Sequence, residues 1–288
     1  MKKLFREYLS ALKPLPVEGI TDLVSFRPLG FLLMKLFCLF PITPNQVSVS
    51  AMLTGILCGV CFSLGTPQSF LFAGIFYGIT HLLDCTDGML ARFKKNGTPT
   101  GRIIDGLIDY VNGVAIFLGL GIGMSRMALS LPVSAWLAAA LAAISLAFHS
   151  ILVDYYRSQY FMHALGTFNT LDDEIAEFTT ELKKLKRQNA QPIAQKIITI
   201  YLGYCRIQKK FSGKPRKYNT QQYYQTNKYL MFLWSPVDLS THTLVLIVSA
   251  VLYKPEIYLI YTILFANLGV LLIAPIHNAI NKKNEIVS

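Results

Sequence analysis

Six apolar runs, each close to the length of a bilayer-spanning helix, restrict the fold of this chain more than any other feature. A helix needs about 20 predominantly apolar residues to cross the hydrocarbon core. Hydrophobic residues make up 53% of the chain and charged residues 15%, which is unlike an ordinary soluble domain. We therefore expect an all-α, polytopic membrane protein with six transmembrane helices. The predicted spans lie at about 46–65, 69–84, 101–124, 131–155, 239–253 and 257–276.

The residues before the first span mix apolar and charged positions. Lys2, Lys3 and Arg6 interrupt any apolar core of a cleavable signal, so we expect an N-terminal amphipathic helix on the bilayer surface. Residues 24–40 are apolar but broken by charged residues, proline and glycine, which is typical of an interfacial helix rather than a crossing. Together they predict an interfacial segment over residues 1–43.

The distribution of basic residues predicts the orientation in the membrane. If the N-terminus is cytoplasmic, only Arg126 and Lys254 of the 27 Lys and Arg fall on the far side. This is the positive-inside pattern, and it accounts for the net charge of +11 without nucleic acid as a partner. The five cysteines suggest no disulfide framework. We expect a multi-pass protein of a bacterial inner membrane, with membrane lipids as partners and a homodimer as a candidate assembly.

The connection between the fourth and fifth spans differs in composition from the rest of the chain. Its polar, charge-rich sequence has helical periodicity over about 172–188 and 193–207, followed by a basic run at 209–217. We read it as a cytoplasmic helical connector, 161–230, whose basic residues lie against anionic lipid. A nucleic-acid patch is the other reading of the basic run.

Four carboxylates stand where the second and third spans approach one membrane boundary. Asp84 and Asp87 are three residues apart and share one helix face, and Asp105 and Asp109 are four residues apart and share another. The loop between the two helices is short, so the helices are antiparallel neighbours and all four carboxylates can converge. Ionisable residues at such a depth usually mark a functional site.

The ligand chemistry of this acidic stretch indicates hard divalent cations. Oxygen ligands suit Mg²⁺ or Mn²⁺, and the sequence has no His and Cys set at zinc spacing. Bound cations would offset the repulsion between the carboxylates, and two ions could hold a pyrophosphate. Small residues at Gly88, Ala91 and Gly101 leave room for a ligand, and Arg92 can reach a phosphate.

These positions together carry a family resemblance. The pattern resembles the signature of the CDP-alcohol phosphotransferases (CDP-alcohol phosphatidyltransferases) at every fixed position. It reads Asp84-x2-Asp87-Gly88-x2-Ala91-Arg92-x8-Gly101-x3-Asp105-x3-Asp109. The start of the first span, Pro44-Asn45, is also similar to the family, as are six spans behind an interfacial helix.

The resemblance implies a role for each position. Asp84, Asp87 and Asp105 would ligate a pair of Mg²⁺ or Mn²⁺ ions, with Asp109 completing the cage and serving as general base. The nucleotide would lie against the remaining motif positions, with its phosphates on the arginine. These positions are Gly88, Ala91, Arg92 and Gly101. An acceptor hydroxyl would attack the phosphorus next to the donor alcohol, and CMP would leave.

The surrounding sequence suggests further candidates and a division of the chain. His81, one turn before Asp84, and Asn45 are candidates for the surroundings of the site. His149 and Asp154, on the fourth span, are open between a place in the cavity and a packing role. The catalytic transmembrane core would cover 44–160, and the last two spans with the C-terminal tail 231–288.

The substrates follow less directly from the sequence. We favour transfer of a phosphatidyl group from CDP-diacylglycerol to a small polar alcohol; the alternative is transfer of phosphocholine or phosphoethanolamine to diacylglycerol or ceramide. Tyr110 follows Asp109 where family members that use a phosphorylated polyol often carry arginine. Functions of another class are a divalent-cation transporter and a membrane scaffold. Clustering near one face, rather than at the bilayer midplane, argues against the transporter.

Overall fold

The computed structural model describes residues 2–127, 129, 131–166, 171–188, 192–211 and 218–285. In these residues the fold is all-α, and six helical runs are long and apolar enough to cross a membrane. The first four contain α3 (Pro44–Ser63), α4 (Pro67–Lys94), α5 (Pro99–Arg126) and α6 (Ala135–Tyr160), the last continued by η3 (Phe161–Leu165). The fifth joins α9 (Thr220–Leu230), η4 (Met231–Val237) and α10 (Leu239–Val251). The sixth joins α11 (Pro255–Ile260), η5 (Tyr261–Ala266) and α12 (Asn267–Lys283).

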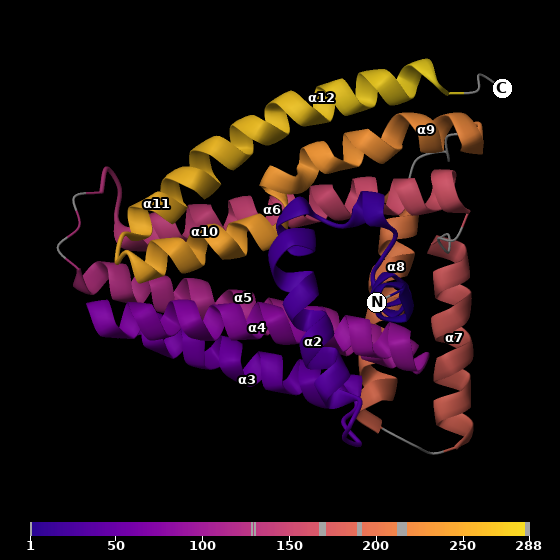
Figure 1. Cartoon of the computed structure of the whole chain (residues 1–288), viewed down its shortest axis with the longest axis horizontal. Helices are drawn as coiled ribbons and strands as arrows, with labels where there is room; N and C mark the ends of the chain where they lie inside the picture. Colours follow the sequence, from indigo (N-terminus) through magenta and orange to yellow (C-terminus); the bar gives the residue numbers. More distant parts are fainter. Residues whose placement is uncertain are drawn as a thin grey trace.

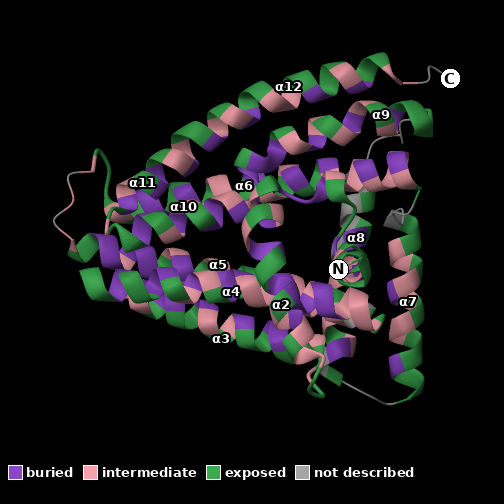
Figure 2. Ribbon diagram, viewed as in Figure 1, coloured by how far each residue is buried: buried purple, intermediate pink, exposed green. Residues whose placement is uncertain are grey.

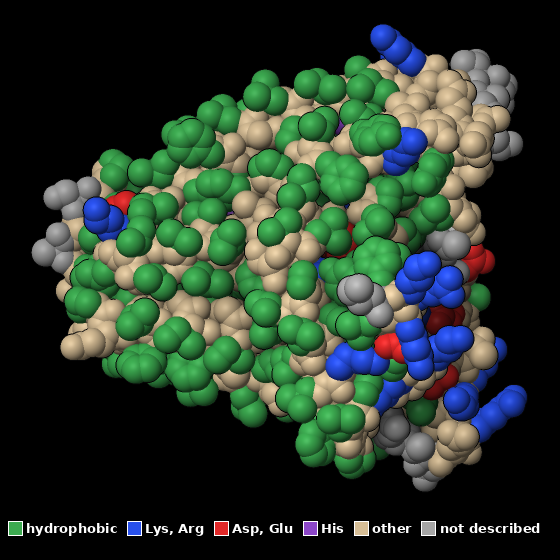
Figure 3. Space-filling view, viewed as in Figure 1, with side chains coloured by type: hydrophobic (Ala, Val, Ile, Leu, Met, Phe, Trp, Pro, Cys, Tyr) green, Lys and Arg blue, Asp and Glu red, His purple; other side chains and the backbone are tan. Residues whose placement is uncertain are grey.

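The long helices run between two ends of different character. The hairpin of α7 (Leu171–Arg187) and α8 (Pro192–Phe211) lies at one end, together with α1 (Lys2–Ala11) and the end of α12 (Figure 1). Lys and Arg side chains gather at this end, which we call the basic end, and hydrophobic side chains are spread over the rest of the face seen in Figure 3. The chain is thus an integral, multi-pass membrane protein with a strong difference in charge between its two ends.

The fifth candidate span extends further toward the N-terminus than its hydropathy predicts. Helix α10 begins at Leu239, where the span was predicted to start, but the candidate run also includes η4 and α9 back to Thr220, in the range assigned to the connector. The polar residues of α9 are satisfied by α12. Asn227 donates to Asn281 at 3.0 Å, and His277 Nε2 lies 2.7 Å from Asn227 Oδ1. Internal hydrogen bonds of this kind let polar residues lie within a helical bundle in lipid.

The helices that surround the acidic residues begin at well-defined caps. Thr43 at the start of α3 and Thr66 at the start of α4 each form a capping box, with Gln46 and Ser69 respectively. The side chain of Thr98 accepts a hydrogen bond from the Gly101 amide at the start of α5. Each of these three helices has proline in its first turn, where a missing N–H costs nothing.

Glycines allow α3 and α5 to cross at very short distance. A Cβ placed on Gly119 would lie 2.0 Å from the carbonyl oxygen of Gly59, and one on Gly123 would lie 2.0 Å from that of Phe62. Any side chain at these positions would push the two helices apart. Small residues have the same role in other membrane helix pairs, where close packing takes the place of the hydrophobic effect.

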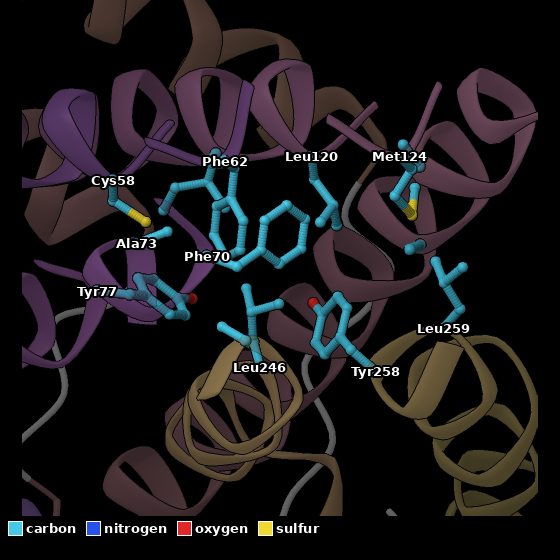
Figure 4. Close-up of a cluster of buried hydrophobic side chains, with 14 of the residues drawn as sticks. Cys58, Phe62, Phe70, Ala73, Tyr77, Leu120, Met124, Leu246, Tyr258 and Leu259 are labelled. Atoms are coloured by element: carbon cyan, nitrogen blue, oxygen red, sulfur yellow. The ribbon is translucent and has the colours of Figure 1, made fainter. Parts of the chain in front are cut away.

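The main apolar cluster lies between α3, α4, α5, α6, α10 and α11. Phe62, Phe70, Leu120 and Tyr258 point into its centre (Figure 4). Buried residues line the interior of the bundle, and exposed residues alternate with them along the outer faces of the spans (Figure 2). Many of the exposed residues are Leu, Ile, Val and Phe, as expected for faces in contact with lipid.

The N-terminal segment packs against the bundle through buried charges. After α1 come η1 (Leu15–Val17), η2 (Asp22–Phe26) and α2 (Arg27–Phe37). Arg27 pairs with Glu18 at 2.9 Å, and both side chains are almost fully buried. With η2, α2 forms one helical run over residues 20–37 that is not among the six candidate spans, because it carries three charged residues, Asp22, Arg27 and Lys35. Its interfacial location stays a prediction.

Candidate active site at the basic end

Three aspartates from two helices form the centre of the candidate site. Asp84 and Asp87 lie on α4 and Asp105 on α5, and each offers an oxygen within 4.8 Å of the others. Asp87 is buried, and the other two are half-buried. The short connection between α4 and α5 makes the helices neighbours, so three of the four carboxylates that were predicted to converge do meet among the described residues.

A serine from a third helix fixes one of these carboxylates. Ser48 Oγ of α3 donates a hydrogen bond to Asp87 Oδ2 at 2.5 Å, and Ser48 is buried. Ser48 was not among the predicted site residues. A polar residue one turn after the start of an apolar helix was the available sequence signal, but many such residues only bond to their own backbone. The bond leaves the second oxygen of Asp87 to face the other two carboxylates.

Asp109 is placed differently from the three converging aspartates. It lies one turn beyond Asp105 on α5, is exposed, and is outside the group of three in the described part of the chain. Its neighbour Tyr110 is 74% exposed. An exposed carboxylate next to a cluster of carboxylates can exchange protons with a bound substrate.

The residues present fit a hard divalent cation. Three carboxylates that meet at half-buried positions repel one another, and an ion with oxygen ligands removes this cost. A second convergent group is buried and joins His81 and Cys85 of the same helix, α4, to Asp22 of the N-terminal segment. There Asp22 is already paired with His81 at 3.3 Å and lies 3.8 Å from Arg27. That group is therefore an internal ion-pair network.

Arg92 has one nitrogen anchored and one without a partner. Its Nε donates to the carbonyl oxygen of Ala11 at 2.7 Å, which joins the end of α1 to α4. Its Nη2 is buried and has no hydrogen-bond partner among the described residues. The guanidinium lies over Gly88, since a Cβ there would be 3.4 Å from Nη1 of Arg92. A buried donor of this kind favours an anionic ligand.

The other small residues of the motif adjoin neighbouring helices. A Cβ on Gly101 would lie 3.3 Å from Asn45 Oδ1 of α3, so the starts of α3 and α5 meet here. Ala91 is half-buried one turn before the end of α4. A Cβ on Gly97 would lie 3.8 Å from the Cβ of Ala91. A larger side chain at Gly101 would crowd Thr98 and Asn45, so glycine here lets the two helix starts approach each other.

Three candidates lie apart from the aspartate group. His81 faces Asp22 of the N-terminal segment and packs edge-on against Phe26, with 4.4 Å between ring centroids. His149 is buried and stacks on His242, with 3.2 Å between their nitrogens. Asp154 is exposed and lies 3.8 Å from Arg157. His81 and His149 thus pack against other helices.

Comparison with known proteins agrees with this geometry. The family model for CDP-alcohol phosphatidyltransferase matches residues 41–182. These residues are a CDP-alcohol phosphatidyltransferase domain. The matched region contains every aspartate of the site, Ser48, and the first part of the α7–α8 hairpin. The predicted family is therefore confirmed.

A curated relative shares part of this region. It is the bifunctional IPC transferase and DIPP synthase of Thermococcus kodakarensis, 38% identical over 73 residues. The aligned stretch is 25% of this chain and 16% of the relative. Similarity over so small a part of the relative shows that this region is related. It does not carry the relative's substrates over to this chain.

Proposed function

We propose that this CDP-alcohol phosphatidyltransferase moves a phosphatidyl group from CDP-diacylglycerol to the hydroxyl of a small polar alcohol and releases CMP. The observation that carries the proposal is the convergence of Asp84, Asp87 and Asp105 within 4.8 Å, with Asp109 exposed one turn away. This arrangement offers both a cation site for a diphosphate and a separate base.

The three converging aspartates would hold the divalent ions of the site. A pair of Mg²⁺ or Mn²⁺ ions, when bound, supplies positive charge to the diphosphate and to the leaving CMP. Asp109 is proposed to take the proton of the acceptor hydroxyl. The acceptor oxygen then forms a bond to the phosphorus next to the diacylglycerol, and the bond from that phosphorus to the CMP oxygen breaks.

The donor nucleotide is proposed to lie between α4 and the start of α5. Small residues at Gly88, Ala91 and Gly101 let a ligand approach the helix backbones closely. The unpartnered Nη2 of Arg92 is available to a phosphate oxygen. Asn45 adjoins Gly101 and so borders the same region. Each of these residues contributes to binding the donor rather than to the proton transfer.

Two features favour a lipid as the donor. The aspartates lie within candidate membrane spans, so a headgroup anchored in the bilayer reaches them without leaving the membrane. An open groove of about 490 Å³ between α1 and α2 is lined by apolar residues that include Leu4, Phe5 and Phe31. This groove lies beside the helix whose end binds Arg92. Acyl chains match its chemistry.

The basic end is proposed to face the cytoplasm, with the protein in a bacterial inner membrane. Lys and Arg gather at this end, as the positive-inside rule requires of cytoplasmic loops (Figure 3). Cytidine nucleotides would reach the site from this side.

A panel of donors and acceptors tests the proposal. Purified protein in mixed micelles would be given CDP-diacylglycerol, CDP-choline or CDP-ethanolamine with Mg²⁺ or Mn²⁺ and a series of alcohols, and products identified by mass spectrometry. Of the three donors, we expect only CDP-diacylglycerol to yield CMP and a new phospholipid. The Asp105→Ala variant should show no turnover. Turnover of CDP-choline with diacylglycerol would support the alternative branch. Metal flux in liposomes without CMP release would contradict both.

A further inference from the structure

The α7–α8 hairpin packs onto the first turns of α5. A buried apolar cluster in the described residues joins Ile103 of α5 to Phe178 and Leu185 of α7 and to Ile198 and Leu202 of α8. The hairpin lies across the basic end of the bundle, beyond the spans (Figure 1). Ile103 is thus held by a segment outside the predicted catalytic core.

The residue before Ile103 makes a second contact with the same hairpin. Arg102 Nη2 lies 2.7 Å from Glu177 Oε2, and the guanidinium carbon of Arg102 lies 5.5 Å from the ring centre of Phe178. An ion pair and a cation–π contact act on one side chain from two successive residues of α7. Two consecutive residues of α5 are therefore fixed by the hairpin.

These contacts lie within one helical turn of the site. Gly101 directly precedes Arg102, and Asp105 follows Arg102 by three residues, so both lie within one turn of Arg102 on α5. Asp109 lies one further turn away from the hairpin. A shift of the first turn would therefore move Gly101 and Asp105 more than Asp109.

The hairpin has the internal contacts of a rigid unit. Tyr201 of α8 donates to Glu174 of α7 at 2.8 Å, and Gln195 donates to the carbonyl of Leu185 at 3.3 Å. Acidic residues occupy the first turn of α7 and basic residues its last turn, which matches the helix dipole. A rigid unit can set the position of the turn on which it packs.

We propose that the α7–α8 hairpin is part of the active centre, with Glu177 and Phe178 as positioning residues. They hold Arg102 and Ile103, and thereby place Gly101 against the donor nucleotide and Asp105 against the divalent ion. This inference rests on the proposed function for the identity of the ligands. It gives the segment between the fourth and fifth spans a role in donor and metal binding.

Two substitutions with a matched control test the proposal by steady-state kinetics. Glu177→Gln and Phe178→Leu should each raise KM for the CDP-alcohol and the half-saturating Mn²⁺ concentration about three- to tenfold, with kcat within about twofold. Glu181→Gln is the control, because Glu181 lies one turn further on α7 and pairs with Lys184 of the same helix. It should leave both constants unchanged. A lower kcat with unchanged KM would indicate only a loss of folded enzyme and would overturn the proposal.

A double-mutant cycle tests whether the effect passes through Arg102. Arg102→Gln and Glu177→Gln remove opposite sides of the same contact, so the double variant should have a KM no higher than that of the worse single variant. Independent, multiplying effects would show that the two residues act separately and would overturn the proposed route.

Thermal melting with Mn²⁺ and CMP supplies a readout that needs no turnover. Wild-type protein should gain stability from Mn²⁺, and Glu177→Gln should need a several-fold higher concentration for the same gain. If the wild type turns over no CDP-alcohol, but Glu177→Gln still needs more Mn²⁺ than the wild type for the same gain in stability, the proposed function fails and the hairpin inference stands. If turnover is found and Mn²⁺ dependence is the same in both proteins, the hairpin inference fails alone.

Discussion

The hydroxyl of Ser48 lies 2.5 Å from a carboxylate oxygen of Asp87, so α3 determines how α4 presents a proposed metal ligand. A residue that hydrogen-bonds to a ligating carboxylate fixes its rotamer and leaves the other oxygen directed at the ion. The site therefore depends on three helices, although the motif lies on two.

Replacing Ser48 by alanine should weaken metal binding. Partners of metal ligands typically contribute about 10- to 100-fold to metal affinity or activity, so Ser48→Ala should raise the Mn²⁺ concentration required for half activity by at least tenfold. Ser50→Ala is the control, since the Ser50 hydroxyl is exposed and bonds only to the carbonyl of Gln46 on its own helix. An unchanged Mn²⁺ requirement in Ser48→Ala would show that Asp87 is oriented without the serine.

Asp109→Asn should separate chemistry from binding. A general base acts in the transition state, so we expect kcat to fall by about 10²- to 10⁴-fold while the affinity for the donor changes little. The measurement is single-turnover kinetics together with equilibrium binding of the donor in Mn²⁺. Parallel losses of donor affinity and turnover would instead identify Asp109 as a metal ligand.

The crossing of α3 and α5 should tolerate no added methyl group. Gly119→Ala would place its Cβ 2.0 Å from the Gly59 carbonyl oxygen, so the helices must separate, at a cost of a few kcal/mol. The check is thermal melting in detergent, where Tm should fall clearly. Gly113→Ala is the matched control, because nothing lies within 4 Å of its Cβ and alanine favours a helix by roughly 0.5–1 kcal/mol. Equal melting of both variants would contradict the close crossing.

Asp22 should stabilise the protein in a pH-dependent manner. Burial raises the pKa of Asp22, but the hydrogen bond with His81 and the charge of Arg27 lower it by more, and the net pKa lies well below its usual value. A depressed pKa stabilises the fold above the unfolded value of about 3.9, and this contribution is lost as the pH falls through the folded pKa.

Asp22→Asn should therefore lower the free energy of unfolding by about 3 kcal/mol at neutral pH, since it removes a carboxylate from beside the buried Arg27 and His81. Thermal melting of both proteins from pH 7 to pH 3 checks this. The difference in Tm should shrink below about pH 4. A difference that stays constant over this range would show that the carboxylate charge is not the cause.

The spacing of the aspartates was sufficient to predict that Asp84, Asp87 and Asp105 meet, because helical geometry and one short loop determine the outcome. The extension of the fifth candidate span through α9 could not be predicted, because the polar residues of α9 are offset by partners such as Asn281, far along the chain. Ser48 and the contact between Ile103 and the hairpin depend on packing between distant segments in the same way. Sequence spacing therefore predicts contacts between residues that are close along the chain, and it does not predict contacts between distant segments.

The contact between Arg92 and Ala11 has a consequence for how this protein can diverge. Arg92 binds the main-chain oxygen of residue 11, which every amino acid provides. The side chain at position 11 is free to change among small residues without loss of the bond, so the two positions need not co-vary among homologues. The exposed positions of the N-terminal helix can then vary in sequence while its junction with the proposed nucleotide site stays the same.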